Sequence, residues 1–342
     1  MNHPKLLLTE KKTADLRSVD EVRSSLTNPK VRKIWDILLS QAQADLTAPP
    51  YTPATMVPDR IEAQAEAANR DYVIVHAAAS RIQRAALVGL LTGESRFKEE
   101  AIRQLECIYD DSIWPDWRDM AHLHTEADLR TGQFMRAIGF AYDWLYPSLS
   151  SKEGEWIIAE LDRRGIQPYL KALASNTFWI ASREPNNWMT CIVGGAGIAG
   201  MAFGADHPSS NNLTDLAVSR MEGYLNVLGS EGEHNESIGY SGAMRFPIEF
   251  FSVHRYWLGG GDNKLLSDQY RSFCNWYMHF IVPPGVNAPF GDSHLDAPPF
   301  SPMFATMAAA LQEPVFQWFY ENHHQQSLQG DLCAELLSYD PT

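Results

Sequence analysis

Hydrophobic residues recur at every third or fourth position over most of this 342-residue chain. This spacing gathers them on one face of an α-helix. Helices are predicted at residues 31–46, 71–91, 95–109, 125–146, 151–174, 188–204, 213–228, 241–258, 263–280, 301–311 and 313–327. Residues 1–30 are interpreted as an arm with a short apolar patch and one short helix. No stretch shows the alternation typical of a β-strand, so the chain is predicted to be all-α.

The predicted helices, about ten in number, follow one another as consecutive antiparallel pairs. Such pairs bury their apolar faces by stacking side by side in a ring or a solenoid. The absence of a fixed-period repeat favours a ring of divergent hairpins. We therefore predict an incomplete (α/α) toroid at residues 51–331, preceded by lead-in helices at 1–50 and followed by a tail at 332–342.

The stretch Ser230–Arg245 interrupts the apolar pattern between two helical regions. Its sixteen residues include three carboxylates, a histidine, a tyrosine, an arginine and three glycines. A polar loop carried by buried helices is a common place for catalytic or binding residues. It can equally be a solvated turn, and this stretch alone does not decide between the two interpretations.

Composition narrows the classes of partner. The formal net charge of −14 argues against nucleic acid and requires a locally positive site for any anionic ligand. Aromatic residues form 11% of the chain, which suits a carbohydrate-binding cleft as well as a large helical core. We expect buried free thiols at the four cysteines, which are far apart beside apolar residues: Cys107, Cys191, Cys274 and Cys333.

The sequence contains no run of 18 or more apolar residues, so we expect no membrane span. The segment Met1–Lys12 lacks the pattern of a secretory signal. A cytoplasmic location is therefore expected, with the periplasm as the second choice. The sequence leaves the oligomeric state open, a homo-oligomer included.

Three other predicted loops carry polar residues. They contain His122 and His124, the segment Arg183–Trp188, and the segment Gly291–His294. If alternate loops of a toroid gather at one end, these loops share a groove with Ser230–Arg245. A metal could bind Asp292 and His294 with a histidine of the first loop, but scattered residues of this kind more often form hydrogen bonds, so no metal is expected.

Several loop residues have two interpretations. Asn186 and Asn187 precede a helix, where an Asn either caps the first turn or donates to a ligand carboxylate. Tyr240 begins a helix and either packs at the rim or serves as an acid or base once a cation lowers its pKa. His234 and Glu236 either stabilise their loop or contact a ligand.

Taken in order, several short segments resemble the heparinase II/III-like polysaccharide lyases, a family that includes exo-acting alginate lyases. The segments are Leu6–Thr9, Ala141–Tyr146, Asn186–Trp188 with Gly194 and Gly195 downstream, Glu231–Tyr240 and Gly291–Ser293. Glu231–Tyr240 is similar to the family's pattern Asp-Gly-x-x-x-Glu-x-x-x-Tyr, with Glu231 in place of the usual Asp. Together the segments span nearly the whole chain.

The resemblance implies an (α/α) toroid followed by a β-sandwich, which this sequence lacks, so that residues 332–342 are expected to be a linker toward it. It also implies β-elimination at a uronic acid without a cofactor. In that reaction Asn187 resembles the Asn that neutralises the carboxylate, and Tyr240 resembles the catalytic Tyr. Trp188 stands where some members have His, so that assisting role stays unassigned.

The leading hypothesis is therefore a polysaccharide lyase, a carbon–oxygen lyase acting on an acidic polysaccharide or oligosaccharide, or the toroid half of one. Substrate binding is expected at Arg183, Asn186, Trp188, His234, Glu236, Arg245, His122, His124 and His294. One alternative is an (α/α)-barrel glycoside hydrolase that uses Glu231, Glu236 or Asp292 as acid and base. The other is a non-catalytic toroid that binds acidic glycans.

Overall fold

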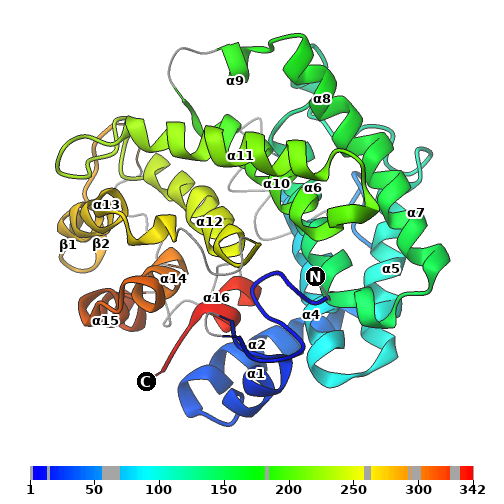
Figure 1. Ribbon diagram of the computed structural model, residues 1–342, viewed down its shortest axis with the longest axis horizontal. Helices are drawn as coiled ribbons and strands as arrows, with labels where there is room; N and C mark the ends of the chain where they lie inside the picture. The colour runs from blue at the N-terminus through cyan, green and yellow to red at the C-terminus, as the bar shows by residue number, and fades with distance from the viewer. Residues whose placement is uncertain are drawn as a thin grey trace.

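The computed structural model describes residues 3–13, 16–55, 70–181, 185–257, 263–291, 293, 302–323 and 332–341. Its helices form two concentric layers around a central axis (Figure 1). The inner layer consists of α4 (Arg70–Thr92), α6 (Leu129–Leu145), α10 (Asn187–Phe203), α12 (Arg245–Trp257), α14 (Pro302–Leu311) and α16 (Leu332–Ser338). Each inner helix packs on the next, and α16 packs on α4, so the ring is closed.

Outer helices cover this ring. They are α1 (Val19–Ser25), α2 (Pro29–Asp45), α5 (Ser95–Tyr109), α7 (Ser151–Leu161), α8 (Gln167–Ala174), α11 (Ser210–Tyr224), α13 (Asp268–His279) and α15 (Pro314–His323). Short elements in the connections are η1 (Met120–His122), η2 (Tyr146–Ser148), α9 (Phe178–Ala181), η4 (Gly204–Asp206), η5 (Leu225–Val227), η6 (Tyr240–Met244) and η7 (Lys264–Leu266). In the described part of the chain the strands are β1 (Ile281–Val282) and β2 (Val286–Asn287), an antiparallel pair in which Val282 faces Val286.

The prediction of an all-α toroid is confirmed. The described residues form a closed helical ring and contain no β-sandwich. The tail predicted at 332–342 is corrected by the structure, because Leu332–Ser338 form α16 and pack on α14, α2 and α4. The helix predicted at 151–174 is divided into α7 and α8 by a π-helical turn, Asp162–Ile166.

Glycines allow α6 and α10 to approach closely. A Cβ atom on Gly195 would lie 2.1 Å from the carbonyl oxygen of Gly132, and one on Gly132 would lie 2.7 Å from that of Cys191. A Cβ on Gly139 would lie 3.0 Å from the Cα of Ala199. Contacts this close leave no room for larger residues, so the backbones of the two helices touch.

These contacts also fix the direction of the inner helices. The residue numbers rise together from Gly132 beside Cys191 to Gly139 beside Ala199, so α6 and α10 are parallel. Gly197 of α10 lies against Phe250, in the body of α12, which extends the inner layer around the ring. Helices α6 and α10 begin at the same end of the ring, which we call the N-terminal end.

A buried segment, His3–Thr9, lies at the opposite end and is called the N-terminal arm. The backbone N–H groups of Lys5 and Leu6 donate to the carboxylate of Asp143, at 3.0 Å and 2.8 Å. The indole of Trp144 donates to the carbonyl of Leu6 at 3.1 Å. Asp143 and Trp144 are among the last residues of α6, so the arm crosses the end away from where α6 and α10 begin.

Helix α10 is long and strongly apolar. With the turn that follows it, Asn187–Asp206 meets the length and composition of such a span, although 83% of its most apolar window is buried inside the ring. A core helix of a large helical domain meets the same test. We therefore interpret α10 as the central helix of the core.

Candidate functional site

The loop Ser230–Arg245 is packed against neighbouring segments and is not an open turn. A Cβ on Gly232, whose φ is +86°, would lie 2.2 Å from the backbone of Ser272 in α13. Ser293 Oγ accepts a hydrogen bond from the backbone N–H of Gly239 at 2.8 Å. The structure therefore brings the 230–245 loop into contact with Ser293.

His234 lies inside this loop. Its Nε2 is 3.0 Å from the hydroxyl of Tyr224, and its Nδ1 accepts from the backbone N–H of Glu236 at 3.4 Å. Burial lowers the pKa of His234 to about 4. The imidazole is therefore neutral near pH 7, and these contacts hold the loop together.

His234 makes stability depend on pH. In the unfolded chain an imidazole binds a proton below about pH 6.5, whereas in the fold it does so only near its pKa of about 4. The unfolded state binds more protons in this window, so the free energy of unfolding falls as the pH drops through it, by roughly 2 kcal/mol at pH 5. We expect His234→Asn to have a smaller loss of stability between pH 7.5 and pH 5 than the parent in urea titrations. Equal losses in the two proteins would contradict this role.

Tyr240 and Asn187 each stand at the start of a helical element, and the two elements are in contact. Tyr240 is the first residue of η6, its N–H donates to Ser237 Oγ at 3.0 Å, and its side chain is 39% exposed. The helix η6 packs against α10. Asn187 is the first residue of α10, so the two residues singled out for catalysis begin two elements that are in contact.

The sequence predicts a capping Asn before α10, and the structure confirms it. Asn186 is the N-cap, and its Oδ1 accepts from the N–H of Met189 at 3.0 Å. This leaves Asn187, half-buried in the first turn, at the positive end of a helix of 17 residues. That position favours an anion such as a sugar carboxylate.

Four aromatic side chains gather beside Asn187, and we call them the aromatic group: His122, His124, Phe178 and Trp188. Trp188 stands edge-on to His122 and Phe178, with ring centroids 4.6 Å and 4.9 Å apart. The rings of His124 and Phe178 stack at 6.4 Å. Phe178 is 49% exposed, so the group presents ring surface at the protein's exterior. Flat ring surfaces of this kind suit the apolar face of a sugar.

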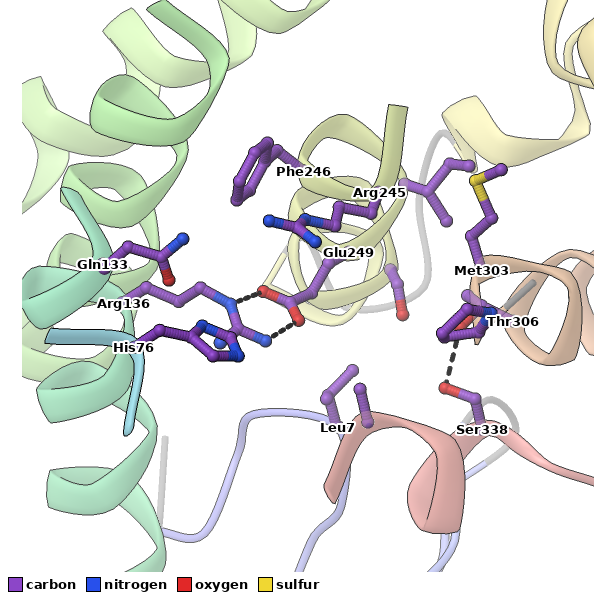
Figure 2. A pocket seen from close by; sticks show the side chains of 14 residues that line it. Leu7, His76, Gln133, Arg136, Arg245, Phe246, Glu249, Met303, Thr306 and Ser338 are labelled. Carbon is purple, nitrogen blue, oxygen red and sulfur yellow. Dashed lines mark hydrogen bonds and ion pairs between the residues drawn. The ribbon is translucent and has the colours of Figure 1, made fainter. Parts of the chain in front are cut away.

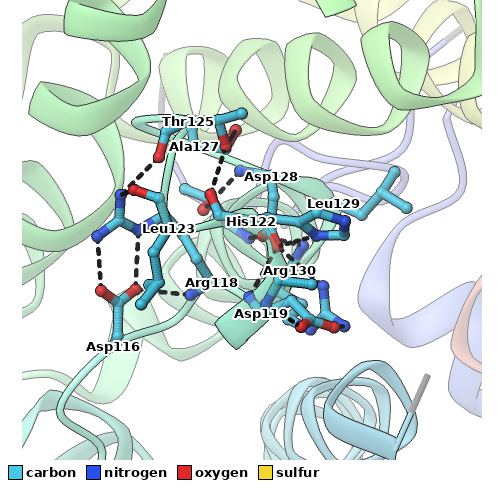
Figure 3. Close-up of polar contacts among 12 residues, drawn as sticks. Asp116, Arg118, Asp119, His122, Leu123, Thr125, Ala127, Asp128, Leu129 and Arg130 are labelled. Atoms are coloured by element: carbon cyan, nitrogen blue, oxygen red, sulfur yellow. Dashed lines mark hydrogen bonds and ion pairs between the residues drawn. The ribbon is translucent and has the colours of Figure 1, made fainter. Parts of the chain in front are cut away.

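Asp128 holds the loop that carries the two histidines (Figure 3). Its carboxylate lies 3.2 Å from His122 Nδ1 and accepts from the N–H of Asp119 at 2.9 Å and from Arg130 Nη1 at 2.8 Å. Asp128 also caps α6, because its Oδ1 accepts from the N–H of Arg130 at 2.9 Å. The position of His122 is thus fixed by the same residue that starts an inner helix.

A cavity of about 140 Å³ lies among the inner helices. Arg136 of α6 and Glu249 of α12 meet across it (Figure 2). Arg136 donates to both carboxylate oxygens, at 2.5 Å through Nε, and donates through Nη1 to Gln83 at 3.0 Å. Arg245, at the start of α12, lines the same cavity and packs its guanidinium over the ring of Phe246 at 4.7 Å.

Among these cavity residues, sequence reasoning singled out only Arg245. The sequence does contain a sign of the other residues. Arg136 in α6 and Glu249 in α12 are charged residues within the apolar stripe of a helix. A buried charge is costly unless it is paired, so such positions indicate a partner on a neighbouring helix. The helical pattern does not reveal which helix provides that partner.

The remaining predicted residues have the following places. Glu231 and Glu236 are exposed on the loop. Arg183, Asp292 and His294 lie outside the described residues. In the part of the chain that the structure describes, no three His, Cys, Asp or Glu side chains are grouped to hold a metal ion. The four cysteines are buried and free, as predicted from the sequence.

Comparison with known proteins identifies the fold. No protein-family model matches the sequence, and no curated protein matches it. The structure is similar to the crystal structure of an alginate lyase from Bacteroides ovatus, with a TM-score of 0.59 and 11% sequence identity. The match covers 95% of this chain and 97% of that chain. The chain thus has the mostly helical fold of an alginate lyase structure.

Proposed function

We propose that this protein is a polysaccharide lyase that cleaves a polysaccharide or oligosaccharide containing uronic acid by β-elimination. The observation that carries the proposal is that Asn187 and Tyr240 begin two elements in contact with each other, α10 and η6. The fold, shared with an alginate lyase structure, supports it. Asn187 and Tyr240 also belong to two of the sequence segments that resemble the heparinase II/III-like lyases, Asn186–Trp188 and Glu231–Tyr240.

In β-elimination the proton on C5 of the uronate leaves, the bond between C4 and the glycosidic oxygen breaks, and a double bond forms between C4 and C5. The amide of Asn187, at the positive end of α10, donates to the uronate carboxylate and stabilises the charge that develops when the C5 proton leaves. Tyr240 in its deprotonated form removes that proton and then donates it to the leaving oxygen.

Substrate recognition rests on two further features. The aromatic group beside Asn187 offers ring faces to the sugars. Arg245, in the first turn of α12, supplies positive charge in a protein whose formal net charge is −14. A local cation of this kind attracts an acidic chain against the unfavourable overall field.

The experiment is an assay of the protein with a panel of uronic-acid polysaccharides and their short oligomers. Elimination leaves an unsaturated uronate that absorbs ultraviolet light, so absorbance rises with each bond broken. A rise with at least one uronate substrate, and none with a neutral glycan, is the expected result. New reducing ends without absorbance would instead indicate hydrolysis, and binding without either product would indicate a glycan-binding protein.

A further inference from the structure

Two serine hydroxyls hold the backbone where Tyr240 begins η6. The N–H of Tyr240 donates to Ser237 Oγ at 3.0 Å, and the N–H of Gly239 donates to Ser293 Oγ at 2.8 Å. Ser237 belongs to the same loop as Tyr240 and moves with it. Ser293 lies 54 positions beyond Gly239, so its hydroxyl joins the loop to a separate segment of the fold.

Gly291, in the same segment as Ser293, touches the other end of this turn. A Cβ atom on Gly291 would lie 2.3 Å from the carbonyl oxygen of Glu236 and 2.9 Å from the Cβ of Ser237. Its φ of +57° lies in the left-handed region that glycine adopts without strain. The N–H of Ser293 donates to the carbonyl oxygen of Gly291 at 3.0 Å. Gly291 and Ser293 therefore contact both ends of the turn 236–239, and we call these two residues the clamp.

The clamp is fixed to α13 through the strands β1 and β2, which lie beside that helix (Figure 1). Ala288, directly after β2, donates its N–H to the carbonyl oxygen of Phe280 at 2.7 Å. The ring of Phe290 packs against those of Phe280 and Trp276, with centroids 5.2 Å and 6.1 Å away. Trp276 belongs to α13, and Phe280 is the residue that follows its last turn. An outer helix therefore determines where the clamp stands.

We propose that Ser293 is a positioning residue for the reaction: through Gly239 it sets the place of the Tyr240 hydroxyl, and it does not itself touch the substrate. The proposal rests on the proposed function, in which Tyr240 moves the proton. The side chain of Tyr240 is 39% exposed, so its direction depends on how its backbone is held. Misplacement of a reacting group by about 1 Å can cost about 100-fold in rate, so one hydrogen bond at this turn affects turnover.

The first test is kinetic. Ser293→Ala removes the acceptor for the N–H of Gly239 and is expected to lower kcat about 10- to 100-fold, while KM changes little because the residues that bind the sugar are unaltered. Ser293→Thr keeps the hydroxyl and should restore most of the rate. Ser150→Ala is the matched control, because Ser150 Oγ also accepts a backbone N–H, that of Glu153 at 3.3 Å, at the start of α7. It should keep the parent's kcat.

A double variant separates the positioning of Tyr240 from a general weakening of the fold. If Ser293 acts through the Tyr240 hydroxyl, Ser293→Ala should slow the Tyr240→Phe protein by less than about twofold, since the hydroxyl that it positions is already absent. A structural effect independent of Tyr240 would slow both backgrounds by the same factor. Equal factors, an unchanged kcat in Ser293→Ala, or a Ser293→Thr protein as slow as Ser293→Ala would overturn the proposal.

The second test measures the contact without turnover. Amide hydrogen exchange, followed by NMR, should be about fivefold or more faster at Gly239 in Ser293→Ala than in the parent, and unchanged there in Ser150→Ala. Equal exchange at Gly239 in all three proteins would overturn the proposal, whatever the kinetics. Faster exchange together with no unsaturated product from any uronate in the panel assay would overturn the proposed function, and with it the role of Ser293 in turnover, while leaving the clamp in place.

Discussion

Tyr240→Phe is expected to lower kcat for β-elimination by roughly 10²–10⁴-fold, the usual contribution of a positioned acid or base. The phenyl ring keeps the shape of the side chain, so KM should change little. Tyr240 is 39% exposed, and removal of its hydroxyl should leave the free energy of unfolding nearly the same. Initial rates of ultraviolet absorbance, with the substrate found in the panel assay, measure the effect.

Tyr146→Phe is the matched control for this change. Tyr146 is also an exposed tyrosine, 42% accessible, but it follows the last residue of α6 at the opposite end of the ring. It should keep the parent's rate. A Tyr240→Phe protein as active as the Tyr146→Phe protein would remove Tyr240 from the reaction.

Gly195→Ala is expected to destabilise the protein by roughly 3 kcal/mol, near the upper end for overpacking of a core. The added Cβ would lie 2.1 Å from the carbonyl oxygen of Gly132, so α6 and α10 would have to separate. These helices form the most extensive contact between two elements of the described structure. Urea unfolding of the variant and the parent measures the difference.

Gly223→Ala is expected to stabilise the protein instead of destabilising it. Gly223 also lies in a helix, α11, but a Cβ there meets no atom within 4 Å. Alanine lowers the conformational entropy of the unfolded chain, so this variant should be about 0.5–1 kcal/mol more stable. If both variants shift stability in the same direction, backbone contact at Gly195 does not limit the packing of α6 and α10.

Much of the helical architecture could be predicted because local patterns determine it. The predicted helix 95–109 and the observed α5 have the same bounds, and Asn186 caps α10 as its position before an apolar run indicates. Helix α16 was missed because seven residues give too short a pattern to separate a helix from a tail. Its stability comes from packing on α14, α2 and α4, which are distant in sequence.

The cavity could not be predicted for a related reason. Arg136 pairs with Glu249, 113 positions away, and Leu7 of the N-terminal arm lines the same cavity. Hydrophobic periodicity shows which face of a helix is buried, but it contains no information on which helices become neighbours in a ring. The loop residues could be proposed as site residues because polar clusters between helices are visible in a single sequence.

The closure of the ring by α16 has a consequence for the order of folding. Arg17 donates to the carbonyl oxygens of Leu336 and Leu337, contacts that span 319 and 320 positions of the chain. Contacts between segments so far apart form slowly, and during synthesis they must wait until the last helix has left the ribosome. Leu7 and Ser338 line the cavity together, so the cavity is complete only after the last helix has joined the ring. A nascent chain would thus carry its loops and most of its helices before this cavity is complete.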